Sequence, residues 1–123
     1  MGELIRRISG LSLGSFFRER VARRVEADFH IGLDPVEFDR TAEILDGGPM
    51  EMPDGVEIPD FYQGRVDGTP ELSQAVWNSS GWRQAESPAA NGPGNARGVV
   101  RAQTAVANGG SAFGVTLMSQ KTF

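Results

Sequence analysis

The chain is 123 residues long, which is enough for one domain with one core. Its apolar fraction is 39%, its 16 Gly and 7 Pro indicate long irregular connections, and the absence of Cys excludes disulfides and thiolate chemistry. The net charge of −4 is uneven, with +3 over residues 1–26 and −7 over the remainder. No run approaches the about 20 apolar residues of a membrane span, and no signal peptide is recognisable, so a soluble cytoplasmic protein is expected.

Two helices are expected at the N-terminus. Leu4, Ile5 and Ile8 fall on one face of a helix over residues 2–8, which Gly10 ends. Ser12 is a suitable N-cap for a second helix that continues to about Val25. The apolar stripe of this second helix consists of Leu13, Phe16, Phe17, Val21 and Val25.

The second helix, residues 12–25, is rich in arginine outside its apolar stripe. A basic amphipathic helix can bind a membrane or a nucleic acid. The alternative is a core-packed helix with a solvated arginine face, which the interleaved Glu19 and Glu26 favour because they weaken the positive field. We therefore expect neither a nucleic-acid partner nor a membrane partner.

The middle of the chain is predicted to contain a strand, a short helix and a long loop. Apolar residues at 29, 31 and 33 alternate with His30 and Gly32, which is typical of a strand. The run from Asp34 through Pro35 to Glu37 resembles a capping box and predicts one or two helical turns. Residues 46–70 are acidic and rich in Gly and Pro, and loops of such length are usually functional or disordered.

Helices alternate with loops in the last third of the chain. A short helix is expected from residues 69–71 to about Trp77, followed by a loop over residues 78–94. Asn95 can cap a helix that ends at residues 108–110. Residues 115 and 117 are predicted to be extended, and Ser119 to cap one more helix. The buried face of the helix after Asn95 is expected to consist of Ala96, Val99, Val100 and Ala107.

The sequence holds no complete set of catalytic residues. A Ser–Lys nucleophile pair needs the two residues three apart on a helix, but the only lysine is Lys121 and position 118 is Met118. The sequence has no Gly-x-Ser-x-Gly motif whose serine could be activated by the only histidine, His30. We expect His30 to be partly buried and bonded to backbone. The only tyrosine, Tyr62, lies in the acidic segment.

No metal or anion site is expected. Asp54, Glu57 and Asp60 lack the alternating spacing of an EF-hand loop, and zinc would need more ligands than His30. Residues 92–95 precede a helix and could offer N–H groups to an anion, but they match no nucleotide-binding fingerprint, so an ordinary turn is predicted.

Two blocks of the sequence match a known family in order and spacing. The first comprises residues 2–10, 12–18 and 27–33, and the second comprises residues 88–99, 105–110 and 114–119. These blocks resemble β-lactamase-related serine hydrolases, most closely the carboxylesterase branch often called family VIII. The resemblance covers most of the chain except residues 46–70. Ser15, where the family commonly has Glu, and Pro93, where it commonly has His, depart from the pattern.

The resemblance implies an α+β fold of the β-lactamase/transpeptidase type, in which a helical subdomain flanks an antiparallel sheet. Residues 1–123 would be a partial domain, an internal fragment made of most of the helical subdomain. The implied parent reaction is acyl transfer from a small-molecule ester or amide to a serine, then hydrolysis, without a cofactor. The family's Ser-x-x-Lys, Tyr motif and Gly-rich strand fall outside the chain, so the segment alone is predicted to be inactive.

The resemblance also implies a wall of the substrate cleft, formed by Ala90, Asn91 and Gly92. Gly92 lets backbone approach a ligand closely, and Asn91 offers both a donor and an acceptor. As a loop side chain, Asn91 is expected to bury little area. The alternative is that these residues only make a turn. A competing hypothesis for the whole chain is a non-catalytic remnant or an interaction module that uses the arginine-rich helix over residues 12–25.

Overall fold

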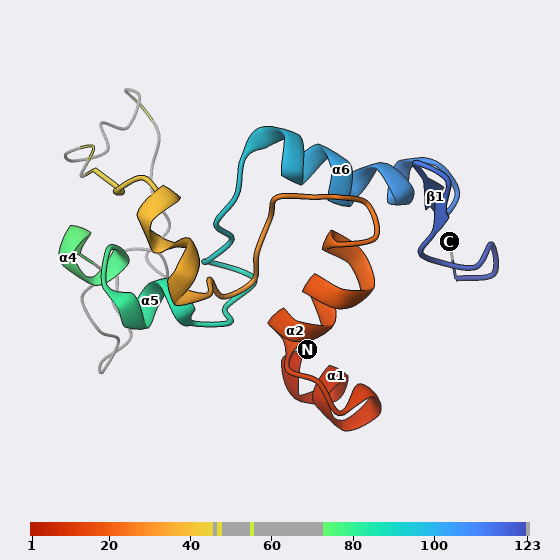
Figure 1. Cartoon of the computed structure of the whole chain (residues 1–123), viewed down its shortest axis with the longest axis horizontal. Coiled ribbons are helices and arrows are strands. Elements are labelled where there is room, and N and C mark those ends of the chain that lie inside the picture. The colour runs from red at the N-terminus through yellow and green to blue at the C-terminus, as the bar shows by residue number, and fades with distance from the viewer. Residues whose placement is uncertain (46, 48–54, 56–72, 123) are drawn as a thin grey trace.

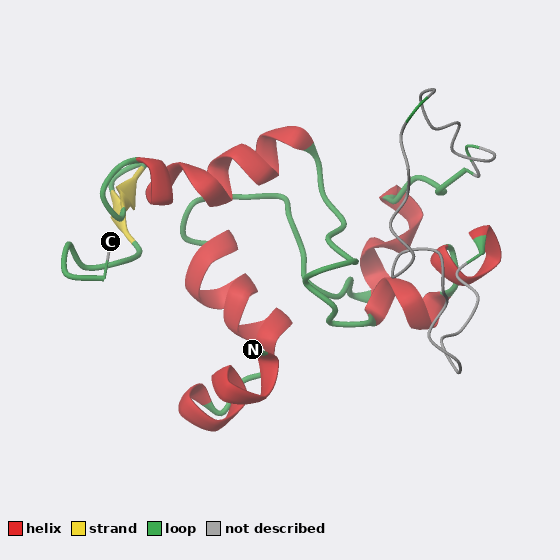
Figure 2. Cartoon of the chain, turned by 180° about the vertical axis from the view of Figure 1, so that it is seen from behind, coloured by secondary structure: helices red, strands yellow, loops and turns green. Residues whose placement is uncertain are grey.

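The computed structural model describes residues 1–45, 47, 55 and 73–122 of the chain. Regular structure in those residues is mostly helical, and one two-stranded hairpin lies near the C-terminus (Figure 2). This agrees with the expectation of a mainly helical segment. No helix within the described ranges is both long and apolar enough to cross a membrane.

Helix α1 spans Gly2–Ser9 and ends where the sequence predicts (Figure 1). Gly10 follows it with a φ of 74°, a left-handed conformation that glycine adopts without a steric penalty. The N–H of Gly10 donates to the carbonyl of Arg6 at 2.9 Å, which satisfies one of the free carbonyls at the helix end.

Helix α2 spans Leu13–Phe17 and continues directly into a π-helical segment, η1, over Arg18–Ala22. Ser12 caps α2 as predicted, because its Oγ accepts a hydrogen bond from the backbone N–H of Ser15 at 3.2 Å. Regular helix ends at Ala22, and the residues up to Glu26 form turns instead of the predicted last helical turn.

The strand expected over residues 29–33 is not formed. Its only ladder contact in the described chain is an isolated antiparallel bridge between Phe29 and Gly94, so the segment is extended without a sheet partner. The short helix that follows is confirmed as the 3-10 helix η2, Pro35–Arg40. Asp34 caps it by accepting from the N–H of Val36 at 3.1 Å.

Two short helices occupy the region before the long C-terminal helix. The predicted start at residues 69–71 lies outside the described residues, and α4 is observed over Gln74–Trp77 with Ser73 as its cap. Helix α5, Ser80–Gln84, falls in the segment that was expected to be a loop. The side chain of Ser79 accepts from the N–H of Trp82 at 3.2 Å and so caps α5.

The long helix α6, Ala96–Ala107, begins at Asn95 as predicted. The Oδ1 of Asn95 accepts from the N–H of Gly98 at 2.8 Å. The hairpin of β1, Ser111–Ala112, and β2, Val115–Thr116, follows it. Residues 119–122 form a turn rather than the helix expected after Ser119.

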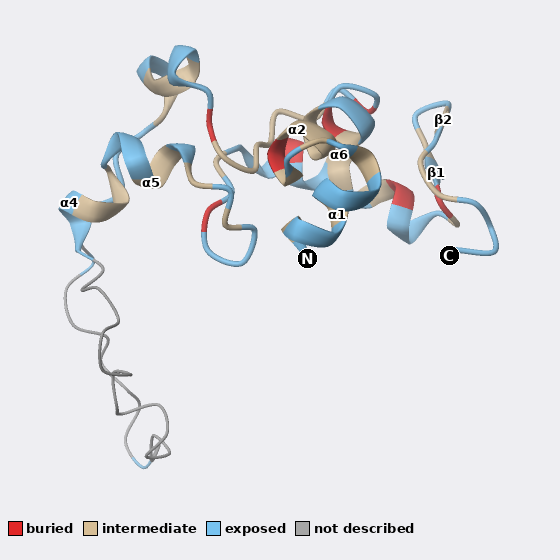
Figure 3. Cartoon of the chain, turned by 90° about the horizontal axis from the view of Figure 1, so that it is seen from below, coloured by how far each residue is buried: buried red, intermediate tan, exposed pale blue. Residues whose placement is uncertain are grey.

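The apolar core of the described residues is small and lies mainly where α2 and η1 pass beneath α6 (Figure 3). Its buried apolar side chains are Ala22, Val25, Leu33 and Ala105. The predicted buried face of α6 is wrong, because Val99 and Val100 are 43% and 61% exposed. Helix α6 instead turns Gly98 inward, and a Cβ there would lie 2.2 Å from the backbone oxygen of Asp28. Only glycine allows so close a backbone contact.

Exposed apolar side chains on the helices lead to a prediction about association. Leu4 and Ile8 of α1 and Val99, Val100 and Val106 of α6 are all exposed. Apolar patches of a few hundred Å² tend to associate. We expect the sedimentation coefficient of the chain to rise with concentration, and the double variant Val100→Lys/Val106→Lys to reduce this rise. A concentration-independent monomer would contradict the prediction.

Candidate functional site

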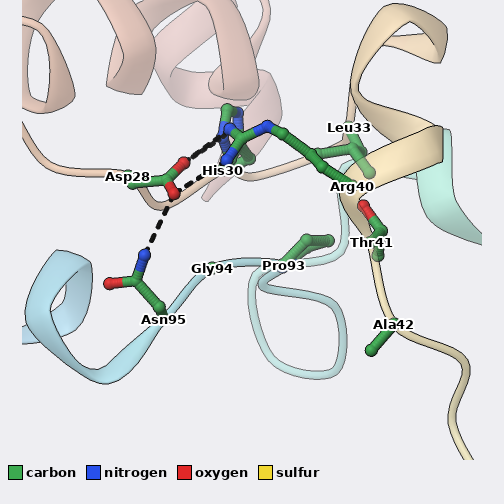
Figure 4. Close-up of a pocket in the computed structure, with 9 residues that line it drawn as sticks. All are labelled: Asp28, His30, Leu33, Arg40, Thr41, Ala42, Pro93, Gly94 and Asn95. Atoms are coloured by element: carbon green, nitrogen blue, oxygen red, sulfur yellow. Dashed lines mark hydrogen bonds and ion pairs between the residues drawn. The ribbon is translucent and has the colours of Figure 1, made fainter.

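Two adjoining hollows, together called the trough, lie between residues 41–44 and residues 90–94. The first hollow has a volume of about 290 Å³ and the second about 370 Å³. They share four lining residues, Thr41 and Ala42 on one wall and Pro93 and Gly94 on the other. The first hollow is polar at its end, where it is lined by Asp28, His30, Arg40 and Asn95 (Figure 4).

The carboxylate of Asp28 joins the polar groups of the first hollow. Arg40 donates to it twice, from Nη1 to Oδ2 at 2.9 Å and from Nη2 to Oδ1 at 2.6 Å. The Nδ2 of Asn95 donates to Oδ2 at 3.0 Å, and the Nε2 of His30 lies 3.2 Å from Oδ1. One carboxylate therefore contacts three side chains from three separate segments of the chain.

The charge of Arg40 makes Asp28 a stronger acid than an ordinary aspartate. The hydrogen bonds from Arg40 are the main cause that lowers the pKa of Asp28 to about 2; partial burial opposes the shift and the contact with His30 reinforces it. The same pairing, together with the ion pair to Glu37, raises the pKa of Arg40. Both groups are therefore ionised near neutral pH.

A pH prediction follows for Asp28. Its folded-state pKa lies below the unfolded value of about 3.9, so its contribution to stability is present above that value and is lost as the pH falls toward about 2. The difference in unfolding free energy between the parent chain and Asp28→Asn should be constant above about pH 5 and shrink below it. Urea titrations of both proteins across this range test it, and a pH-independent difference would contradict it.

The segment after Asp28 binds the opposite wall through its backbone. The N–H of His30 donates to the carbonyl of Pro93 at 2.8 Å, and the N–H of Asn95 donates to the carbonyl of Asp28 at 3.3 Å. Gly94 lies so close that a Cβ there would come within 2.7 Å of the ring of Phe29. Residues 28–30 therefore form the base of the trough, which supports residues 92–95.

The second hollow is more apolar than the first. Trp77 of α4, Trp82 of α5 and Ile44 line it. Asn78 holds Ile44 in position, since it accepts from the N–H of Ile44 and donates to its carbonyl, each at 2.8 Å. The trough therefore passes from a polar end to an aromatic end, an arrangement that suits a ligand with one polar group and one apolar group.

The predicted cleft residues Ala90, Asn91 and Gly92 all line the second hollow. Asn91, however, does not have the predicted exposure, because it is 6% exposed. Its Nδ2 donates to the carbonyl of Ala85 at 2.9 Å and also to that of Trp82. The Asn91 amide therefore fastens its own loop to the end of α5, and the expectation that it buries little area is wrong.

Asn91→Ala is accordingly expected to destabilise the chain. Removal of the amide loses two hydrogen bonds of about 0.5–1.5 kcal/mol each, which costs about 1–3 kcal/mol in total, although both carbonyls keep a backbone N–H donor. Asn91→Asp should be at least as harmful because a carboxylate would face the same carbonyls. Gln103→Ala is the control, since Gln103 is an exposed amide side chain on α6 and its change should stay within about 0.5 kcal/mol. Urea denaturation measures all three, and a parent-like midpoint for Asn91→Asp would contradict the bonding described.

His30 is partly buried as predicted, with its side chain 21% exposed. Its ring bonds to the Asp28 carboxylate rather than to backbone, and it also lies 3.4 Å from Nη2 of Arg40. Asp54, Glu57, Asp60 and Tyr62 lie outside the described residues. Within the described ranges, no group of three or more His, Asp or Glu side chains could hold a metal ion.

Sequence reasoning did not identify Asp28 and Arg40 as site residues. They are 12 positions apart, and although Asp28 lies in the matching segment 27–33, neither residue belongs to a periodic pattern or to a catalytic motif. The sequence identifies Asn95 as a helix cap, a role that uses only its Oδ1. The bond from its Nδ2 to Asp28 could not be predicted, because no nearby residue in the sequence indicates it.

A third hollow, of about 530 Å³, lies on the arginine-rich helix. Phe16 and Val21 face Ala102 and Val106 of α6 across it, and Arg20 and Arg24 are also part of its lining. This surface is separate from the trough.

Comparison with solved structures relates the chain to a larger protein. The crystal structure of a novel penicillin-binding protein (PBP) homolog from Caulobacter crescentus superposes with a TM-score of 0.69 at 27% identity, over 98% of this chain. The chain shares its fold with part of that protein. It spans 31% of that protein's length. The likeness fits the β-lactamase/transpeptidase-like superfamily, whereas no family model and no curated protein matches the sequence.

Proposed function

We propose that this chain is a segment of a β-lactamase-related serine hydrolase that transfers an acyl group from a small ester or amide to a serine and then to water. The observation that carries the proposal is the superposition on the penicillin-binding protein homolog over 98% of the chain. The blocks of sequence that resemble the carboxylesterase branch support the finer assignment to that branch.

In this proposal the chemistry and the cleft wall come from different parts of a longer protein. The nucleophilic Ser and its Lys, the Tyr, and the Gly-rich strand lie outside residues 1–123. The chain contributes the wall at Ala90, Asn91 and Gly92. The exposed residues Ala90 and Gly92, rather than the buried amide of Asn91, are the parts of this wall that can face a substrate. The absence of a side chain at Gly92 makes room for the ring of Phe29, which would lie 2.6 Å from a Cβ there. The predicted cytoplasmic location belongs to the same proposal.

The test begins with the DNA on both sides of this reading frame. In-frame Ser-x-x-Lys and Tyr motifs upstream are expected. The longer protein should then be labelled once by a fluorophosphonate or a fluorescent penicillin, and the variant with that Ser replaced by Ala should not. Flanking DNA without these motifs, or a longer protein with no labelled serine, would overturn the proposal.

One feature supports the competing non-catalytic proposal. The hollow beside Arg20 and Arg24 pairs an apolar floor with two cations, which would suit an acidic, apolar partner segment. Stop codons close to both ends of the reading frame, combined with the absence of any acylated serine, would favour this alternative over the hydrolase.

A further inference from the structure

We infer that Asp28 is a positioning residue that holds the two walls of the trough at a fixed separation. The inference rests on the proposed function only in treating the trough as a substrate cleft. The contacts themselves are those of the described residues (Figure 4).

The first wall is held through Arg40. This residue ends η2 and directly precedes Thr41 and Ala42, which line both hollows. Its guanidinium meets the Asp28 carboxylate with two parallel bonds, a geometry that fixes direction as well as distance. Glu37 also pairs with Arg40, but it lies on the same short helix and cannot fix that helix to anything else.

The second wall is held through Asn95. Its Nδ2 donates to Oδ2 of the same carboxylate, the oxygen that also accepts from Nη1 of Arg40, while its Oδ1 caps α6 at the N–H of Gly98. The wall residues Pro93 and Gly94 directly precede Asn95. The Asp28 carboxylate therefore fixes Arg40, which precedes the first wall, and Asn95, which follows the second wall.

Backbone contacts alone would hold only one of these walls. The carbonyl of Asp28 and the N–H of His30 bond to residues 93–95, so the second wall stays near the base without any side chain. Within the described chain, the Asp28 carboxylate is the group that bonds both to Arg40 and to Asn95. Loss of the carboxylate should therefore free Thr41 and Ala42, while Ile44 stays bonded to Asn78. The polar end of the trough should widen, which would change the size of ligand that it accepts.

The distance between the walls can be measured directly in the 123-residue chain. The sequence has no Cys, so spin labels at Ala42→Cys and Ala90→Cys report only the two walls. Both positions are exposed. Dipolar EPR should give a narrow distance distribution in the parent chain. In Asp28→Ala the distribution should broaden and its mean should move to longer distance.

Two further variants separate positioning from general folding. Asn95→Ser keeps a good helix cap but removes the bond to Asp28. Because the backbone bonds to residues 93 and 95 remain, this variant should broaden the wall distribution less than Asp28→Ala does. Asp39→Ala removes an acid from η2 that does not contact Asp28 and should leave the distribution unchanged. A reference pair, Glu19→Cys and Gln103→Cys on η1 and α6, should keep its distribution in every variant.

Three outcomes would overturn the inference. These are a broad wall distribution in the parent chain, an unchanged wall distribution in Asp28→Ala, and a reference pair that changes together with the walls in Asp28→Ala. None of them bears on acylation of the longer protein. Failure of the labelling test would instead contradict the hydrolase proposal and would not affect the inference about the separation of the two walls.

Discussion

Esters and β-lactams are expected to survive incubation with the 123-residue chain as long as they do in buffer. A serine nucleophile of this superfamily needs a Lys one helical turn away to take its proton. The only lysine is Lys121, and the residue three positions before it is Met118. The chain alone is therefore expected to lack the entire rate enhancement of such an enzyme, which for enzymes is at least about a millionfold.

The assay compares p-nitrophenyl esters and nitrocefin with a buffer blank, and a serine β-lactamase serves as the positive control. Intact mass after treatment with a fluorophosphonate gives an independent readout that does not depend on turnover. Stoichiometric acylation of any serine in the chain would contradict the prediction and would require a nucleophile that works without a Lys partner.

The helix boundaries are the part of the fold that the sequence predicted best. Ser12, Asp34 and Asn95 each bond to an N–H two or three residues ahead, and Gly10 takes the left-handed conformation after α1. These are local interactions whose chemistry is contained within a few residues, so a single sequence is sufficient to identify them. Helix α5 was missed although Ser79 offers the same kind of cap, because the Ser and Gly residues around it favoured a loop.

Packing between distant segments was not predictable in the same way. The strand over residues 29–33 is not formed because its start contacts the loop 92–95 and its end contacts residues 83–86, and neither partner is a neighbouring strand. The buried face of α6 was wrong because hydropathy favours Val99 and Val100, whereas the close approach of the Asp28 backbone selects the smallest residue. The polar end of the trough depends on Asp28 and Arg40, which only the folded chain brings together.

The contact between α6 and the base of the trough makes Gly98→Ala one of the most damaging small substitutions that we expect in the described chain. A Cβ at this position would lie 2.2 Å from the backbone oxygen of Asp28 and 2.6 Å from its carbonyl carbon. Backbone atoms cannot move aside as a flexible side chain can, so α6 would have to shift as a whole. Overpacking of this kind costs about 1–3 kcal/mol and sometimes more, and we expect at least about 3 kcal/mol here.

The shift should also disturb the site, because Asn95 and its bond to Asp28 lie one turn from Gly98. Gly81→Ala is the matched control. Gly81 lies in α5, and nothing lies within 4 Å of the position that a Cβ would take there, so alanine should be neutral or stabilise by about 0.5–1 kcal/mol through its better helix propensity. Urea denaturation followed by circular dichroism compares the two variants with the parent chain. Equal midpoints for Gly98→Ala and Gly81→Ala would mean that α6 does not rest on the backbone of Asp28, and the base of the trough would then have to be reassigned.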